Sequence, residues 1–176
     1  MAPKLLLCVA AGLLLGAAGA SSPIDRMAGR YDSHRQSGDT FGYRYFVDDA
    51  LEIVPLDRRR AYFRARLNFA NHHSCAIWGV AHVEARELVY RTIRYPVAGS
   101  RNCEMRIRVA GNGLDLVDVH QSCAPAHCGV RGSFNHRNPE FQLRSRRPIR
   151  YLGRLRRSPE YAEALREDDV SRGRHR

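Results

Sequence analysis

The chain has 176 residues, with 29 basic and 18 acidic side chains and a formal net charge of +11. This length fits a single domain with a substantial core, and the positive charge favours anionic partners over basic ones. After residue 20 no apolar run is long enough to span a bilayer, so the sequence predicts no transmembrane segment there.

Residues 1–20 have the three-part pattern of a cleavable secretory signal peptide. Lys4 precedes the apolar stretch 5–15, and small residues then lead to an Ala-x-Ala pattern at Ala18 and Ala20. The alternative is a membrane anchor, but the apolar run of 16 residues is short, and half of it is Ala or Gly. We therefore expect an exported protein, secreted or periplasmic, that begins at Ser21.

The basic residues after the leader are all arginine. Lys4 is the only lysine, so the remaining chain carries 28 arginines against 18 acidic residues, a net charge of +10. One explanation is a codon bias of the genome that favours arginine over lysine, which would account for arginine at every basic position. The other is selection for the planar guanidinium group, which binds phosphate or carboxylate through two parallel hydrogen bonds. Either way, an anionic envelope surface or an acidic protein is the expected partner, and export argues against nucleic acid.

After the leader, a polar segment is followed by segments in which apolar and polar residues alternate. Residues 21–40 are polar with little periodicity, and we expect a flexible arm there. Alternation of apolar and polar residues then predicts short strands. The predicted strands are 41–47, 62–69, 75–83, 88–93, 103–109 and 114–119, with later ones at 129–134 and 141–143 and a loop at 96–102.

The Asn112-Gly113 pair lies between two of these strands and is a strong hairpin signal. Strands that follow one another at hairpin spacing predict an antiparallel meander, a small barrel or sandwich in residues 41–145.

Four cysteines follow the leader, namely Cys75, Cys103, Cys123 and Cys128. An even number in an oxidising compartment favours two disulfides over a zinc site or a catalytic thiol. Three pairings are open. We expect Cys75–Cys103 to join two strands and Cys123–Cys128 to close a short loop with turn residues. The sequence predicts no cofactor.

Residues 146–176 are predicted to be a basic extension with a short helix. Ser158 can cap this helix, Pro159 suits its first turn, and Glu160 favours its positive end. Residues 137–157 are rich in arginine, with Glu140 as the one acid. The candidate anion-binding residues are Arg131, Arg144, Arg146, Arg147, Arg150, Arg154, Arg156 and Arg157. The alternative for this run is an ordinary solvated surface.

Three smaller groups are candidates for chemistry. Arg131 can bind an anion or the carboxylate of Asp118, or it can be a structural arginine. Asp115, Asp118 and His120 have the residue types of an acid/base group, but no nucleophile lies nearby in the sequence, which favours a solvated strand face. A metal held by histidines alone ranks low, and its candidate ligands are His72, His73, His120 and His127.

Residues 73–81, 88–90, 103–109, 113–118 and 122–134 together resemble small exported proteins of Gram-negative bacteria. These share a C…C…C-x4-C-G-x-R-G pattern, whose last two residues in this chain are Arg131 and Gly132. Some of them look like partners of lysozyme-inhibitor-like domains. The resemblance covers about half of the chain after the leader and implies a periplasmic β domain without catalytic residues.

From these observations we expect a non-catalytic secreted or periplasmic binding module that contacts an anionic envelope component or a protein partner. The first alternative is an inhibitor or immunity-type protein that blocks another protein. A strongly basic target, such as an animal-type lysozyme, would be repelled by the charge of +10. An envelope hydrolase is the third candidate.

Overall fold

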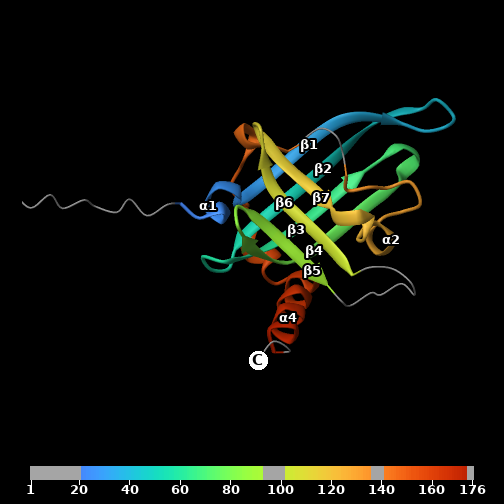
Figure 1. The fold of residues 1–176 in the computed structure, drawn as a ribbon. Coiled ribbons are helices and arrows are strands. Elements are labelled where there is room, and N and C mark those ends of the chain that lie inside the picture. Colours follow the sequence, from blue (N-terminus) through green and yellow to red (C-terminus); the bar gives the residue numbers. More distant parts are fainter. Residues whose placement is uncertain (1–20, 93–101, 136–140, 174–176) are drawn as a thin grey trace, which may run out of the picture.

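The computed structural model describes residues 21–92, 102–135 and 141–173 (Figure 1). Eight strands form one sheet in which each strand pairs antiparallel with its neighbour in the chain. They are β1 (Gly29–Gly38), β2 (Arg44–Pro55), β3 (Arg60–Asn68), β4 (Ser74–Glu84), β5 (Glu87–Thr92), β6 (Cys103–Ala110), β7 (Gly113–Asp118) and β8 (Phe141–Gln142). The helices are α1 (Pro23–Met27), η1 (Ala70–His72), η2 (Val119–Gln121), α2 (Ala124–His127), η3 (Leu143–Ser145), α3 (Leu152–Leu155) and α4 (Pro159–Gly173).

The sheet curls into a nearly closed barrel, which confirms the predicted antiparallel meander. The backbones of Arg30 in β1 and Arg147 after β8 exchange two hydrogen bonds, 2.8 and 2.9 Å long, and so bring the first strand to the last segment. The C-terminal helix is also confirmed as α4. Within the described residues, no helix combines the length and the apolar character needed to cross a membrane.

Some of the sequence predictions fall on residues that the structure does not describe. The predicted signal peptide, residues 1–20, is one of them. Most of the predicted loop 96–102, the arginine at position 137 and the last three residues also lie outside the described ranges.

The inside of the barrel is filled by the apolar residues of the alternating strands. On β3, Phe63, Ala65 and Leu67 are buried in the interior, while Arg64 and Arg66 point to the outside. Side chains from the other strands and loops fill the remaining space, among them Tyr31, Ile77, Met105, Ile107 and Phe134. This alternation is the reason why the strand positions could be read from the sequence.

The outside of strands β2 to β4 is also apolar, and the C-terminal segment covers it. Val54, Tyr62 and Val80 lie on this outer face and are at most 5 % exposed. Leu155 of α3 and Tyr161 of α4 pack on them, so that the molecule has a second, smaller core outside the barrel. The basic extension is therefore a packed part of the domain.

The predicted flexible arm at residues 21–40 is wrong. Ile24 and Met27 of α1 and Tyr31 of β1 are buried in the main core, and β1 pairs with β2 along its whole length. The domain thus begins before residue 41. The periodicity is weak because the outer half of the β1–β2 hairpin extends beyond the barrel, where both of its faces meet solvent (Figure 1).

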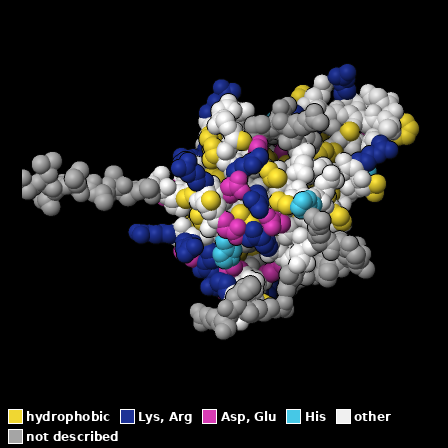
Figure 2. All heavy atoms as spheres, in the orientation of Figure 1, with side chains coloured by type: hydrophobic (Ala, Val, Ile, Leu, Met, Phe, Trp, Pro, Cys, Tyr) yellow, Lys and Arg dark blue, Asp and Glu magenta, His cyan; other side chains and the backbone are white. Residues whose placement is uncertain are grey.

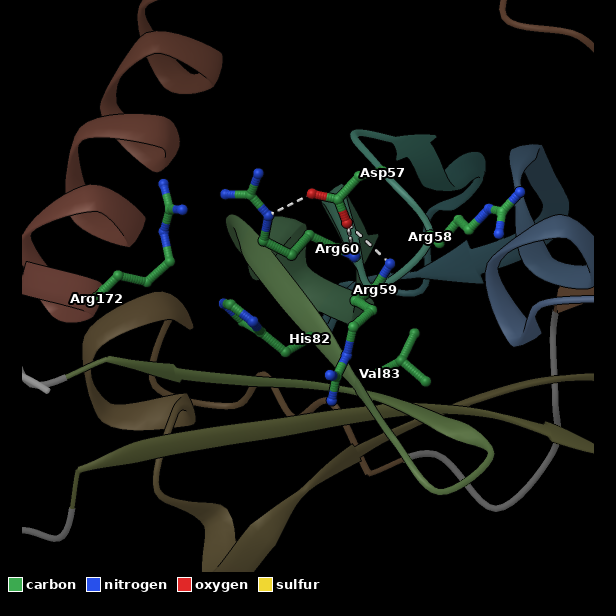
Figure 3. A pocket seen from close by; sticks show the side chains of 7 residues that line it. All are labelled: Asp57, Arg58, Arg59, Arg60, His82, Val83 and Arg172. Atoms are coloured by element: carbon green, nitrogen blue, oxygen red, sulfur yellow. Dashed lines mark hydrogen bonds and ion pairs between the residues drawn. The ribbon is translucent and has the colours of Figure 1, made fainter. Parts of the chain in front are cut away.

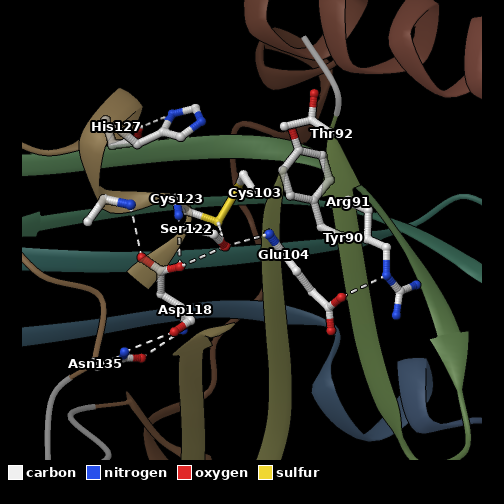
Figure 4. Close-up of a disulfide and its surroundings, with 12 residues drawn as sticks. Tyr90, Arg91, Thr92, Cys103, Glu104, Asp118, Ser122, Cys123, His127 and Asn135 are labelled. Atoms are coloured by element: carbon white, nitrogen blue, oxygen red, sulfur yellow. Dashed lines mark hydrogen bonds and ion pairs between the residues drawn. A yellow bond between two sulfur atoms is a disulfide. The ribbon is translucent and has the colours of Figure 1, made fainter. Parts of the chain in front are cut away.

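The predicted disulfide pairing is wrong as well. The bonds are Cys75–Cys128 and Cys103–Cys123. Cys123 and Cys128 flank α2, and each bonds to a different strand: Cys128 to Cys75 of β4, and Cys123 to Cys103 of β6. Figure 4 shows the second of these bonds. Residues 129–134, predicted as a strand, form turns instead. Gly132 lies so close to the first disulfide that a Cβ on it would be 2.6 Å from the sulfur of Cys75.

Gly79 offers a test of the packing in the barrel. A Cβ at this position would lie 2.2 Å from the ring of Tyr90, which itself packs edge-on against Phe63. We expect Gly79→Ala to displace this ring and to lower the free energy of unfolding by about 2 kcal/mol. Urea denaturation measures the change. Gly173→Ala, where a Cβ meets no neighbour, is the control, and equal stability of the two variants would contradict the packing.

Candidate functional site

A basic pocket opens where the β2–β3 turn, the end of β4 and α4 meet (Figure 3). Its volume is about 580 Å³. The residues that line it are Asp57, Arg58, Arg59, Arg60, His82, Val83 and Arg172. We call it the arginine pocket, because four of these seven side chains are arginine.

Asp57 shapes the turn on one side of the arginine pocket. Its Oδ1 accepts the backbone N–H groups of Arg59 and Arg60 at 2.8 and 2.9 Å, and its Oδ2 accepts Nε of Arg60 at 2.7 Å. Burial by itself would raise the pKa of Asp57, but these hydrogen bonds and the charge of Arg60 outweigh it and lower the pKa. The carboxylate therefore stays charged and holds the three consecutive arginines on a fixed turn.

Asp168 of α4 holds the side of the arginine pocket opposite Asp57. This carboxylate is 5 % exposed and accepts three charged or polar groups from different elements. Arg60 Nη1 and His82 Nε2 are each 2.7 Å away, and Arg172 Nε is at 3.2 Å. Asp168 thereby joins the C-terminal helix to strands β3 and β4.

The balance of charges in the arginine pocket is positive. Arg60 and Arg172 are engaged by Asp57 and Asp168, as described above. Arg58 and Arg59 are exposed, and among the described residues no ion pair involves either guanidinium. These two groups are able to bind an anion without breaking an internal contact, and their planar geometry suits phosphate or carboxylate.

None of the arginines predicted to bind anions lines this pocket. Three of them have structural contacts instead. Arg146 donates to the carbonyl oxygens of Asp25 and Arg26, Arg147 forms an ion pair with Asp32, and Arg154 lies over the ring of Tyr151 at 5.3 Å. The others are exposed on the surface, namely Arg131, Arg144, Arg150, Arg156 and Arg157.

Asp118 is a structural residue and does not pair with Arg131, which was one of the alternatives considered for that arginine. The carboxylate is buried, and its two oxygens accept the backbone N–H groups of Cys123 and Ala124 at 2.8 and 2.9 Å (Figure 4). This contact fixes the start of α2 and so positions Cys123 for its disulfide. Arg131 is exposed on the turn after α2.

The candidate histidines do not form a metal site within the described ranges. Among the residues that the structure describes, no group of three or more His, Cys, Asp or Glu side chains is arranged to hold a metal ion. His72 stacks on Tyr45 at 4.6 Å between ring centroids. His127 is largely buried, with Nδ1 at 3.2 Å from the carbonyl oxygen of Ala76, and burial lowers the pKa of its imidazole.

The arginine pocket was not predicted from the sequence, because only the residues of one side of it are close together in the chain. The run Asp57-Arg58-Arg59-Arg60 is recognisable as a charged turn. Its partner Asp168 comes 108 residues after Arg60, in a helix whose position depends on the packing of the outer core. A run of three arginines after a turn-forming aspartate was the only signal for this site.

Comparison of the chain with family models, with curated proteins and with solved structures finds no match. The resemblance to small exported proteins of Gram-negative bacteria stays a prediction.

Asp168 provides a test of how α4 is held. Asp168→Asn removes the charge that Arg60, His82 and Arg172 share, and we expect the free energy of unfolding to fall by about 2 kcal/mol. Amide exchange should rise throughout α4. The matched control is Asp169→Asn, whose side chain is 68 % exposed. If both variants exchange like the wild type, Asp168 is not the anchor of the helix.

His127 predicts a pH dependence of stability. Its folded pKa lies below the ordinary value of 6.5, so the unfolded chain binds the proton more readily. The free energy of unfolding should therefore fall as the pH drops through about 6.5 toward the folded pKa. Denaturation midpoints at pH about 7.5 and about 5.5 measure this loss. His127→Gln should reduce the difference, and His120→Gln, on an exposed residue, should leave it unchanged.

Proposed function

We propose that this protein is a non-catalytic binding module of the cell envelope or its surroundings, which holds a phosphate or carboxylate group in the arginine pocket. The observation that carries the proposal is the state of Arg58 and Arg59. Both residues line one open cavity, and neither guanidinium group has an ion-pair partner among the described residues. Each unpaired guanidinium can form charged hydrogen bonds with a phosphate or carboxylate group without losing an internal ion pair.

The distribution of the other charges supports this choice of site. On the outer face of β5 to β7, arginines and carboxylates alternate across the strands, and Figure 2 shows them mingled. Arg91 pairs with Glu84 and Glu104, and Arg106 pairs with Glu104 at 2.6 Å. Such a surface is neutralised internally. Much of the charge available to a ligand lies elsewhere, including the arginine pocket and the C-terminal segment.

The exposed arginines of the C-terminal segment support the same function at longer range. Arg144, Arg150, Arg156 and Arg157 have no ion pairs within the described ranges. They raise the local concentration of an anionic ligand, an effect that salt screens over about 10 Å. The two disulfides are compatible with an extracellular or periplasmic protein. An anionic envelope component, such as a phosphorylated glycolipid or an acidic glycan, is therefore the proposed ligand class.

Binding of a phosphorylated glycolipid in detergent micelles tests the proposal. The double variant Arg58→Gln and Arg59→Gln should bind about tenfold more weakly, because it loses charged hydrogen bonds to the phosphate. The control is Arg150→Gln with Arg156→Gln, which removes the same charge outside the pocket. Isothermal titration at two salt concentrations measures both.

The control pair should lose no more than about threefold in affinity, and this loss should disappear at high salt. Equal weakening in the two double variants would contradict a role of the pocket. Binding that is unchanged when the glycolipid lacks its phosphates would contradict the ligand class. Salt-resistant, stoichiometric binding of one protein would favour the inhibitor alternative instead.

A further inference from the structure

Exposed apolar side chains gather at the end of the barrel that lies away from the arginine pocket. Among the described residues, five large apolar side chains are strongly exposed, and four of them belong to the β1–β2 hairpin and to the turn after α2 at this end. Phe41, Tyr43 and Phe46 lie on the β1–β2 hairpin, with exposures of 86, 72 and 64 %. Val130 lies on the turn after α2 and is 96 % exposed.

The hairpin turn presents its aromatic side chains in a fixed form. Oδ1 of Asp39 accepts the backbone N–H groups of Phe41 and Tyr43 at 2.9 and 3.0 Å. The N–H of Thr40 donates to Oδ1 of Asn71 at 2.7 Å, which ties the tip to the connection between β3 and β4. The aromatic rings have no place in the core and remain turned to solvent, although the turn itself is well held.

The Val130 turn belongs to the same end of the molecule. The N–H of Gly129 donates to the carbonyl oxygen of Ser74 at 2.9 Å, and Ser74 begins β4 directly after the η1 connection that holds the hairpin tip. We call these two turns together the apolar end. Figure 1 shows both of them on the side of the barrel away from α1.

Each turn of the apolar end carries an exposed arginine next to its apolar side chain. Arg44 follows Tyr43, and Arg131 follows Val130. Arg44 donates to the neutral amide of Gln36 at 3.2 Å, and in the described part of the chain no carboxylate pairs with either arginine. An apolar group beside a free cation is the combination that an anionic lipid interface accepts, because the headgroups take the charge and the acyl boundary takes the apolar group.

We propose that the apolar end inserts into the interfacial layer of an anionic phospholipid bilayer. Phe41, Tyr43 and Val130 enter the boundary between headgroups and acyl chains, and Arg44 and Arg131 contact the lipid phosphates. Two separate convex turns suit a fluid bilayer, which adapts to each of them. A protein partner would more often require one contiguous, complementary patch.

This orientation leaves the arginine pocket free. Strand β2 begins at the hairpin with Arg44 and ends with Pro55, two residues before the Asp57 turn. Twelve residues of extended chain separate the two sites by about 40 Å. A protein held at a bilayer by its apolar end would therefore present the pocket to a second anionic ligand away from that surface. The bilayer site rests on residues that the proposed function does not use.

Sedimentation with vesicles of phosphatidylglycerol and phosphatidylcholine in equal parts tests the insertion. The double variant Phe41→Ser and Tyr43→Ser should lose about tenfold in partitioning, because two aromatic side chains no longer enter the interface. The matched control is Val170→Ser, on an exposed apolar residue of α4 outside the apolar end. This control and the Arg58→Gln and Arg59→Gln variant should keep at least about half of the binding.

Fluorescence gives a second measurement that does not depend on loss of binding. The chain has one native tryptophan, Trp78, whose emission is the common background of the variants below. Phe41→Trp should show a blue shift of its emission with the anionic vesicles, while Val170→Trp should show none. Vesicles of phosphatidylcholine alone should give a weaker shift, because Arg44 and Arg131 lose their anionic contacts.

Equal partitioning of the Phe41→Ser and Tyr43→Ser variant and the wild type would overturn the proposal, as would equal emission of Phe41→Trp with and without vesicles. If the wild type does not bind these vesicles at all, the apolar end is a surface for a protein partner and the bilayer is excluded. Loss of vesicle binding only in the Arg58→Gln and Arg59→Gln variant would also overturn it and would assign the lipid to the pocket.

Discussion

Tyr62 points away from the interior of the barrel and is nevertheless completely buried. Together with Val54 and Val80, it makes the outer face of β2 to β4 apolar, and such a face must be covered by another element. The C-terminal segment does this with Tyr161, whose ring centroid lies 4.8 Å from that of Tyr62. Burial raises the pKa of Tyr62 accordingly. Because α4 then continues past the β2–β3 turn, the arginine pocket is a consequence of covering this face.

Buried carboxylates hold the covering segment and decide which arginines remain available. Glu52 of β2 is 1 % exposed and accepts Arg30 and Arg64 at 2.7 Å, and Tyr151 of the C-terminal segment also donates to it. Asp168 has the same role at the other end of the segment. Each buried carboxylate stabilises the fold only because it is paired. The net charge of +11 is therefore a poor measure of binding capacity, since many of the guanidinium groups that produce it are already engaged.

The two proposed sites differ in what supports them. The arginine pocket depends on contacts between distant elements, and Arg172 reaches it only when α4 is docked. The hairpin turn of the apolar end depends mainly on local structure, since Asp39 holds the turn that presents Phe41 and Tyr43. Weakening the C-terminal segment should accordingly disturb the first site and spare the second.

The sequence by itself determined most of the strands between residues 62 and 119, their inward and outward faces and the antiparallel order, because alternation with a period of two is a local property of the chain. The helix that starts at Pro159 and the presence of two disulfides among the four cysteines were also predicted correctly, but the predicted partners were wrong. Tertiary structure decided that α2 separates Cys123 from Cys128 and gives each a different strand as its partner. It also decided that residues 29–38 are a strand and that Arg58 and Arg172 share one pocket. These features depend on which distant surfaces meet, and periodicity along the chain carries no information on that.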